Sequence, residues 1–234
     1  MSVYFRPAIA LMAGVCASAF FTAALASNLP QGFVYLADID PSIAQDMRYA
    51  GANNFMHAPV PGYGAAECVL SQHTAAALSR VQADLRAQGY GLLVYDCYRP
   101  AKAVRRFVEW AGEAGDSDPK YYPHVARDRL LAEGYIGRKS AHSSGGTVDL
   151  TLVRLKGTGV ETLPMGTSFD FFDPLAHTTN SRIPSAAKAY RKLLVAAMLR
   201  HDFHNYKREW WHFHDAREPF AGQVFDFDIP PKTP

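Results

Sequence analysis

The segment over residues 147–153 constrains the fold most, because it places an acidic side chain in the middle of an apolar strand pattern. Its sequence, T-V-D-L-T-L-V, alternates polar and apolar residues. The alternation predicts a strand with Asp149 and two threonines on one face and the valine and leucines on the other. An unpaired carboxylate flanked by Val148 and Leu150 would be costly to bury. The fold must therefore bring a cation or hydrogen-bond donors to Asp149.

A histidine stands seven residues before this aspartate, and Gly145-Gly146 lies between them. On one uninterrupted strand, an odd separation would place His142 and Asp149 on opposite faces. Glycine adopts turn conformations that other residues avoid. His142 can therefore come from a loop while Asp149 projects from the strand. The pair is a candidate for half of a metal site, although this spacing alone has little specificity.

A second cluster, R-E-W-W-H-F-H over 208–214, offers the other half. A ligand from His212 would complete a set of two histidines and one carboxylate, which leaves a fourth position open for water, as in catalytic zinc sites. Glu209 would remain free to take a proton from that water. A regular strand would point Glu209 and His212 to opposite sides, so we expect a bulge or bend at Trp210 and Trp211.

The other histidines have no such setting. We expect His214 at the surface or behind a ligand. The rest are expected to be structural or exposed: His57, His73, His124, His177, His201 and His204.

The N-terminus has the pattern of a secretory signal. Arg6 precedes an uncharged apolar stretch that ends in Ala24-Leu25-Ala26, a small-residue cleavage signature. We therefore expect a signal peptide over 1–26 and a single domain over 27–234, exported to the periplasm without stable membrane insertion after cleavage. The alternative is an uncleaved membrane anchor. A lipid anchor at Cys16 is disfavoured by the bulky Val15 before it.

Cleavage would leave two cysteines, Cys68 and Cys97. In an oxidising compartment they could form one disulfide. They could equally be two separate buried thiols. The sequence does not fix their separation, so both alternatives stay open at this point.

Composition and periodicity predict an α+β domain. The chain is 48% hydrophobic and 20% charged, which predicts a sizeable core. Its formal charge of +2 and the lack of a lysine/arginine run give no reason to expect a nucleic-acid partner. Helices and strands in mixed order predict a small, largely antiparallel sheet flanked by helices. We expect helices over 71–88, 101–112 and 185–201, strands over 91–98 and 147–153, a strand or extended stretch over 203–213, and a loop over 53–66.

Several separate motifs resemble one known family. S-x-H-x-x-G-x-x-x-D, from Ser140 to Asp149, and E-x-W-H, from Glu209 to His212, are similar to the D-alanyl-D-alanine dipeptidases of the vancomycin-resistance type, within the zinc D-Ala-D-Ala metallopeptidase superfamily. Three further motifs agree in the same order: D-M-R-Y-A-G-A-N-N-F over 46–55, Y-D-C-Y-R-P over 95–100 and P-M-G-T-S-F-D-F-F-D over 164–173. The resemblance covers essentially the whole chain after the signal. One departure is Cys97, where a glycine is common in the family; a disulfide with Cys68 would explain it.

The resemblance implies a fold, a cofactor and a role for each site residue. The fold would be that of the zinc D-Ala-D-Ala peptidases and hedgehog domains, with one Zn²⁺ in a cleft floored by the sheet. The implied ligands are His142, Asp149 and His212, with Glu209 as general acid/base and Arg99 as the residue that stabilises the oxyanion. Ser140, Asp170 and Tyr49 are implied to line the substrate pocket, with Asp170 near the substrate ammonium group.

The implied reaction is hydrolysis of D-Ala-D-Ala to D-alanine, with zinc-bound water as the nucleophile. Two alternatives use the same machinery differently. One is a D,D- or L,D-carboxypeptidase acting on peptidoglycan stem peptides, and the other is a catalytically silent zinc-binding module, as in hedgehog signalling domains. The presence of Glu209 and Arg99 argues against the silent module.

Overall fold

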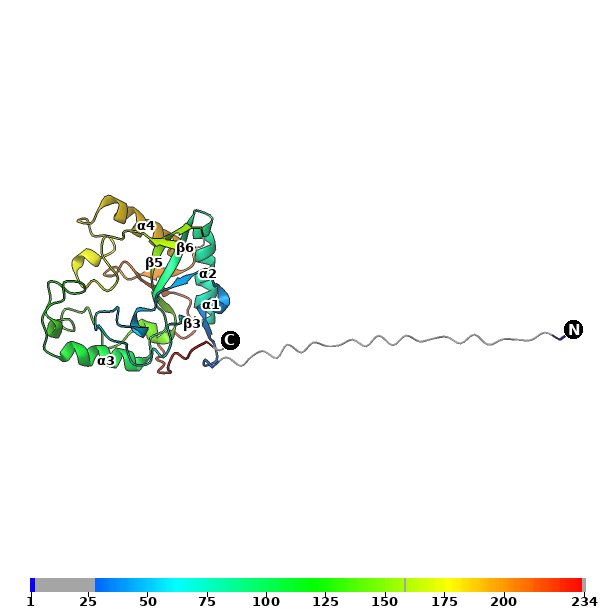
Figure 1. Ribbon diagram of the computed structural model, residues 1–234, viewed down its shortest axis with the longest axis horizontal. Helices are drawn as coiled ribbons and strands as arrows, with labels where there is room; N and C mark the ends of the chain where they lie inside the picture. The colour runs from blue at the N-terminus through cyan, green and yellow to red at the C-terminus, as the bar shows by residue number, and fades with distance from the viewer. Residues whose placement is uncertain (3–27, 158, 233–234) are drawn as a thin grey trace.

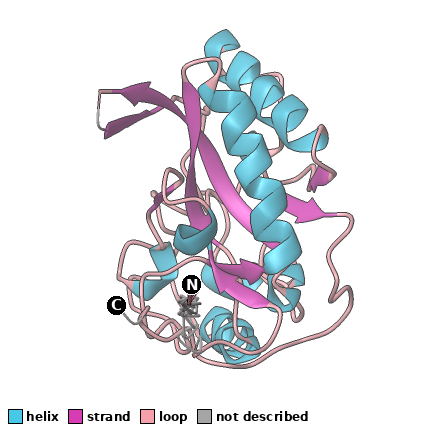
Figure 2. Cartoon of the chain, turned by 90° about the vertical axis from the view of Figure 1, so that its right-hand side faces the viewer, coloured by secondary structure: helices cyan, strands magenta, loops and turns pink. Residues whose placement is uncertain are grey.

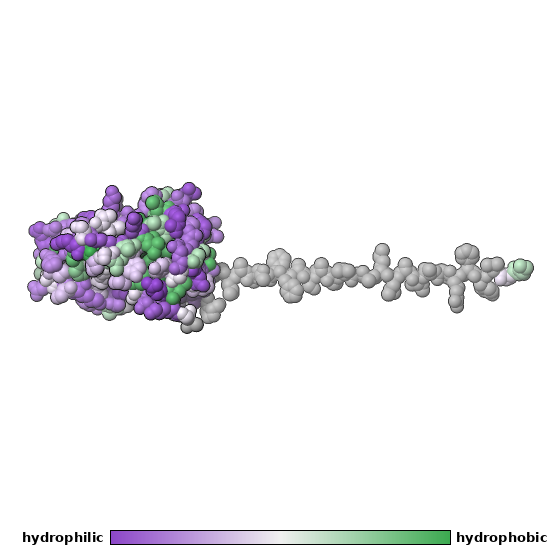
Figure 3. Space-filling view, turned by 90° about the horizontal axis from the view of Figure 1, so that it is seen from above, coloured by the Kyte–Doolittle hydropathy of each residue, from purple (hydrophilic) through white to green (hydrophobic). Residues whose placement is uncertain are grey.

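The structure is a computed structural model that describes residues 1–2, 28–157 and 159–232 (Figure 1). The expected signal lies outside the described residues, apart from Met1 and Ser2. No helix among the described residues is long and apolar enough to cross a membrane. The face of the molecule in Figure 3 is mainly hydrophilic, with apolar residues in smaller patches.

A six-stranded sheet forms the centre of the fold, in the order β2-β4-β5-β8-β7, with β6 paired to the outer part of β5. All of its pairings are antiparallel except β2 with β4. This confirms the α+β class and the largely antiparallel sheet. The strands are β2 (Ala44–Gln45), β4 (Tyr90–Asp96), β5 (Thr147–Lys156), β6 (Gly159–Thr162), β7 (Phe203–Asn205) and β8 (His212–Asp215). A separate two-stranded sheet joins β1 (Phe33–Tyr35) to β3 (Val69–Ser71).

Two long helices, α2 (Gln72–Arg86) and α4 (Ser185–Leu199), contact each other and pack against the sheet (Figure 2). Ser71 caps α2, because its hydroxyl oxygen accepts from the Thr74 amide at 3.2 Å. Cross-strand pairs on β4 and β5, such as Leu92 with Leu152 and Val94 with Leu150, are fully buried. The apolar set of β5 therefore builds the core, as the alternation predicted.

The opposite face of β5 carries Asp149 and is covered by shorter elements and loops. These are α3 (Ala101–Gly112), which matches the expected helix, and the 3-10 turns η1 (Arg48–Ala50) and η3 (Ala141–Ser144). The remaining short elements are α1 (Leu36–Ile39), η2 (Arg127–Arg129) and η4 (Pro174–Ala176). The expected loop over 53–66 contains neither helix nor strand.

The expected extended stretch over 203–213 is instead a hairpin of β7 and β8. The Tyr206 amide donates to the His212 carbonyl at 3.0 Å, and the His212 amide donates to the Glu209 carbonyl at 3.3 Å. The backbone between Glu209 and His212 therefore turns, which confirms the expected bend at the two tryptophans. Strand β5 also continues three residues beyond its expected end at Val153, because β6 pairs with its second half.

Cys68 and Cys97 form a disulfide, with 5.4 Å between their Cα atoms. The bond joins the residue before β3 to the residue after β4. It decides between the two alternatives that the sequence left open.

Candidate active site

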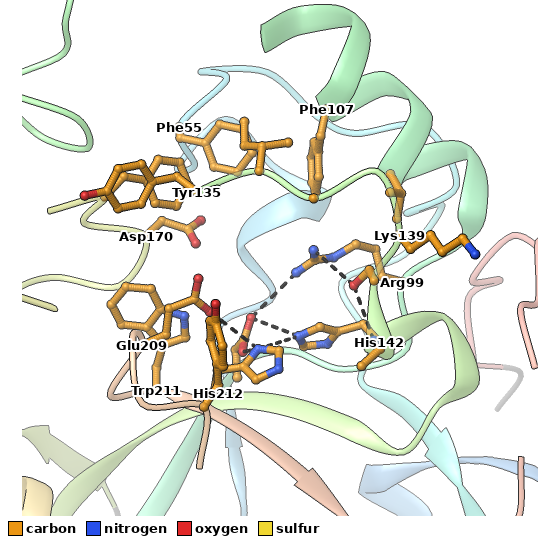
Figure 4. A pocket seen from close by; sticks show the side chains of 18 of the residues that line it. Phe55, Arg99, Phe107, Tyr135, Lys139, His142, Asp170, Glu209, Trp211 and His212 are labelled. Carbon is orange, nitrogen blue, oxygen red and sulfur yellow. Dashed lines mark hydrogen bonds and ion pairs between the residues drawn. The ribbon is translucent and has the colours of Figure 1, made fainter. Parts of the chain in front are cut away.

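A cavity of ≈ 270 Å³ lies over the Asp149 face of the sheet. Figure 4 shows its charged and aromatic side chains directed toward one another from several elements. The structure brings together in its lining all eight residues that the sequence analysis selected, namely Tyr49, Arg99, Ser140, His142, Asp149, Asp170, Glu209 and His212.

The loop that carries His142 depends on its glycines. Ser140 caps η3, since its hydroxyl accepts from the His142 amide at 3.3 Å. Gly145 ends η3 with a φ of 80°, a left-handed conformation that favours glycine, and a Cβ there would lie 2.4 Å from the Phe33 ring. A Cβ at Gly146 would lie 1.9 Å from the Glu218 carboxylate. The chain can therefore turn from η3 directly into β5 only because both positions lack a side chain.

Potential metal-ligand atoms of three side chains lie close together, within 4.8 Å of one another. The Nε2 of His142 lies 3.3 Å from the Nδ1 of His212 and 3.3 Å from the Oδ2 of Asp149, and the His212 Nδ1 lies 3.0 Å from the Asp149 Oδ1. On the far side of its ring, the Nδ1 of His142 donates to the Cys97 carbonyl at 2.7 Å. A carbonyl only accepts, so this bond places the proton on Nδ1 and leaves the Nε2 lone pair facing the cavity.

These three residues fit a divalent metal. The Asp149 Oδ1 is buried and has no hydrogen-bond partner among the described residues, although the His212 Nδ1 is close. Burial alone would raise the pKa of Asp149, but electrostatic attraction from His142 and His212 outweighs it and holds that pKa well below its usual value. A buried carboxylate oxygen without a donor is costly, and a cation beside two imidazoles would satisfy it. Two histidines and one carboxylate match the donor set of catalytic zinc sites.

Glu209 enters the cavity from the turn between β7 and β8. Its Oε2 lies 3.6 Å from the Nδ1 of His212. Burial raises the pKa of Glu209, and the negative charge of Asp149 adds to this although His212 opposes it. Asn205 holds the turn, because its side-chain amide donates to the backbone carbonyls of Glu209 and His212, both at 3.0 Å. The sequence analysis missed Asn205, since only the hairpin reveals its place.

Arg99 is held by an aspartate that the sequence analysis also missed. Its Nε and Nη2 donate to the Asp96 Oδ2 at 2.9 and 2.7 Å, and the Tyr63 hydroxyl donates to the Asp96 Oδ1 at 2.7 Å. Arg99 thereby points its Nη2 to within 3.6 Å of the Asp149 Oδ2 and its Nη1 to within 3.5 Å of the Ser140 hydroxyl. The motif Y-D-C-Y-R-P was the available signal, because it places an acid three residues before the arginine.

Asp170 lies at the other end of the cavity, in aromatic surroundings. Its side chain accepts a hydrogen bond from the Tyr49 hydroxyl at 2.9 Å, and Phe55, Phe172 and Trp211 line the cavity with it. Its backbone has a φ of 56°, a left-handed conformation that is uncommon outside glycine. Burial raises its pKa well above the usual value, and the negative charge of Asp149 raises it further. Among the residues that the structure describes, no cationic side chain lies within hydrogen-bond distance of its carboxylate.

Comparison with known proteins decides the family. The model of the family described as D-ala-D-ala dipeptidase matches residues 30–230. The chain belongs to this family. The D-alanyl-D-alanine dipeptidase of Enterococcus faecalis is 37% identical over 203 residues, which cover 86% of this chain and 100% of that protein. The dipeptidase of the same name from Enterococcus faecium is 38% identical over 85% of this chain and 98% of its own length. That of Escherichia coli is 32% identical over 86% and 94%.

Membership in the dipeptidase family confirms the resemblance found in the motifs, and with it the peptidase class. The matched residues include the whole cavity and its three converging ligand atoms. The geometry gives a possible metal site at His142, Asp149 and His212, within the residues that the family model matches.

Proposed function

We propose that this chain is a zinc-dependent dipeptidase that hydrolyses free D-Ala-D-Ala to two molecules of D-alanine. The observation that carries the proposal is the placement of two different charge sites in one small cavity. A possible metal-ligand set stands at one end. At the other stands the buried carboxylate of Asp170, which has no cationic partner within the described part of the chain. The names of the three similar dipeptidases support the same substrate.

His142, Asp149 and His212 would hold the zinc ion. When bound, zinc supplies a Lewis acid that polarises a carbonyl group and makes water more acidic. Glu209 would take the proton from the attacking water and return it to the leaving amine. Its position suits this role, because its carboxylate lies 3.6 Å from one of the proposed ligands.

Arg99 would stabilise the negative charge that develops on the scissile carbonyl oxygen. Both of its contacts with Asp96 use Nε and Nη2, which leaves Nη1 directed toward Ser140 and the cavity. A guanidinium fixed in advance costs no reorganisation during the reaction. Asp96 is thus proposed to orient Arg99, and Ser140 to contact the substrate beside it.

Asp170 would bind the ammonium group of the substrate, with Tyr49 orienting its carboxylate. A free dipeptide carries a positive charge at this end, whereas a peptide acylated at the same nitrogen carries none. The geometry therefore favours free dipeptides over peptidoglycan stem peptides, because an uncharged amide would leave the buried Asp170 carboxylate without a positively charged partner.

We also propose that the protein is exported and works in the periplasm, after cleavage of the signal over 1–26. The N-terminal sequence pattern supports this proposal. The Cys68–Cys97 disulfide is a second support, because such bonds persist mainly in oxidising compartments.

The test compares two substrates on the purified, zinc-loaded protein. D-alanine release is measured from free D-Ala-D-Ala and from N-acetyl-D-Ala-D-Ala. We expect a preference for the free dipeptide of about 10-fold or more, as loss of a hydrogen bond to a charged group would produce. Equal rates would favour the carboxypeptidase alternative, and no release from either substrate would favour the silent module.

A further inference from the structure

We infer that the Cys68–Cys97 disulfide is a positioning element of the metal centre, so that the chain binds its metal tightly only once this bond has formed. The inference rests on the metal site named in the proposed function. It assigns to the disulfide a role in the site itself, beyond general stability.

The His142 ring is oriented from behind by the residue that carries one of the sulfurs. Its Nδ1 donates to the Cys97 carbonyl at 2.7 Å, and the histidine is only 1% exposed. This bond sets both the tautomer and the direction of Nε2, the atom that faces Asp149 and His212. Groups that accept a hydrogen bond from the second ring nitrogen of a metal-ligating histidine typically contribute about 10–100-fold to metal affinity.

The sheet does not fix the position of this carbonyl. The β4–β5 ladder ends at the pair Asp96 with Asp149, after a register irregularity between Val94 and Asp96. Cys97 lies beyond that last pair. Two links of this stretch lead to the same neighbouring segment: the disulfide to Cys68, and the hydrogen bond from the Tyr98 amide to the Val69 carbonyl at 2.8 Å. Further along, the Tyr98 hydroxyl donates to the Phe227 carbonyl at 3.1 Å and the Arg99 amide donates to the His142 carbonyl at 3.2 Å, but of these links only the disulfide starts at Cys97 itself.

That segment is itself firmly anchored. The Cys68 amide donates to the Gln45 side chain at 2.8 Å, and the Cys68 carbonyl accepts from the Leu36 amide at 2.8 Å. Both cysteines are fully buried. The disulfide therefore connects the backbone behind His142 to a rigid part of the core, which is the condition for holding a ligand in a set direction.

The bond forms by exchange with the disulfide form of a thiol–disulfide oxidoreductase. The two thiols of Cys68 and Cys97 lose two electrons and two protons, and the partner disulfide is reduced to two thiols. In a reducing cytoplasm the cysteines remain thiols. A dipeptidase that acquires its metal only after export would therefore leave D-Ala-D-Ala inside the cell intact.

The experiment measures zinc affinity by competition with a chromophoric chelator. It compares oxidised wild-type protein with the Cys68→Ala/Cys97→Ala variant, which removes the bond without leaving thiols that could bind zinc. Leu85→Ala, a fully buried position in α2 away from the cavity, is the control for general loss of stability. The melting temperature of each metal-free protein is recorded beside the affinity.

We expect zinc to bind the double variant about 10–100-fold more weakly, while Leu85→Ala lowers the melting temperature and leaves zinc affinity within about twofold. An unchanged affinity in the double variant, or an equal loss in Leu85→Ala, would overturn the inference. If Cys68→Ala/Cys97→Ala does not fold, Cys68→Val/Cys97→Ala restores apolar volume and is measured in its place, with the same expected loss. Wild-type protein that binds zinc without cleaving D-Ala-D-Ala would refute the proposed function alone, because the titration follows the metal.

Discussion

Asp149 and Asp170 face the same cavity and are both buried, at 2% and 4% exposure, but their surroundings are opposite. Asp149 has two imidazoles and the Arg99 guanidinium within 3.0–3.6 Å. Asp170 has the Tyr49 hydroxyl and aromatic rings. The pKa of Asp149 is accordingly lowered and that of Asp170 raised. This difference is what the proposed function requires: Asp149 would hold a resident cation, and Asp170 would receive its cation from the substrate.

The largest effect is expected from the metal end of the cavity. Asp149→Asn removes the charged ligand, so we expect zinc affinity to fall by more than the roughly 100-fold that a supporting residue costs, and hydrolysis to be lost with it. Chelator competition measures the affinity. If the variant bound zinc as the wild type does, Asp149 would not be a ligand, and the contrast with Asp170 would lose its basis.

Glu209 lines the same cavity as the two aspartates and belongs to neither role. Glu209→Gln keeps the size of the side chain but removes the proton acceptor. We expect kcat to fall on the order of 10²–10⁴-fold, with zinc affinity unchanged. Steady-state kinetics and metal content check this together. A variant that retained full activity would show that another group carries the proton.

A smaller effect, confined to one substrate, is expected at the other end. Asp170→Asn removes the charge that would pair with the substrate ammonium group. For free D-Ala-D-Ala we expect KM to rise about 10–100-fold, in line with loss of a hydrogen bond to a charged group. Activity on N-acetyl-D-Ala-D-Ala, if measurable, should not fall, because that substrate has no charge to lose. Equal losses on both substrates would contradict the assigned role.

The smallest expected effect is on the free energy of unfolding of the metal-free protein, to which the two aspartates contribute with opposite signs. Below the usual carboxyl pKa of 3.8, Asp170 is protonated in both the folded and the unfolded chain. Above pH 3.8 the unfolded chain releases this proton, whereas the folded chain keeps it because burial raises the pKa of Asp170. The buried Asp170 therefore lowers the free energy of unfolding as pH rises. Asp149 acts in reverse, because its lowered pKa gives stability above 3.8 that is lost in acid.

At neutral pH, Asp170→Asn should therefore raise the free energy of unfolding by about 1 kcal/mol, and Asp149→Asn should lower it by a similar amount. Urea unfolding at several pH values measures both. Both differences should shrink as pH falls, that of Asp170→Asn toward 3.8 and that of Asp149→Asn in stronger acid. Shifts of the same sign would show that the two carboxylates do not differ in the way described.

The metal half of the site could be predicted from the sequence because its signals are local. The alternation over 147–153 placed Asp149 on the polar face of a strand, and Gly145-Gly146 explained how His142 could reach it. The i,i+3 spacing of Glu209 and His212 required a bend, and the structure has a turn there.

The sequence predicted the supporting contacts only in part, because they join distant parts of the chain; the Cys68–Cys97 bond was one of two open alternatives. Asp96 accepts a hydrogen bond from the Tyr63 hydroxyl. Cys97 is bonded to Cys68, 29 residues away in the sequence, and its carbonyl accepts from His142, 45 residues away. Asn205 acts on Glu209 only after the hairpin has formed. Residue types at these positions have no periodic pattern that distinguishes them from ordinary core or loop residues. The roles of Arg99, Ser140, Asp170 and Tyr49 came from the family resemblance and remain predictions.

The most direct test of the account follows D-alanine release from free D-Ala-D-Ala by the purified protein in three successive states. The protein is assayed as isolated with zinc, after removal of the metal with a chelator, and after zinc is restored. The account predicts hydrolysis, its loss, and its recovery. Hydrolysis that persists without metal, or no hydrolysis of this dipeptide in any state, would contradict it.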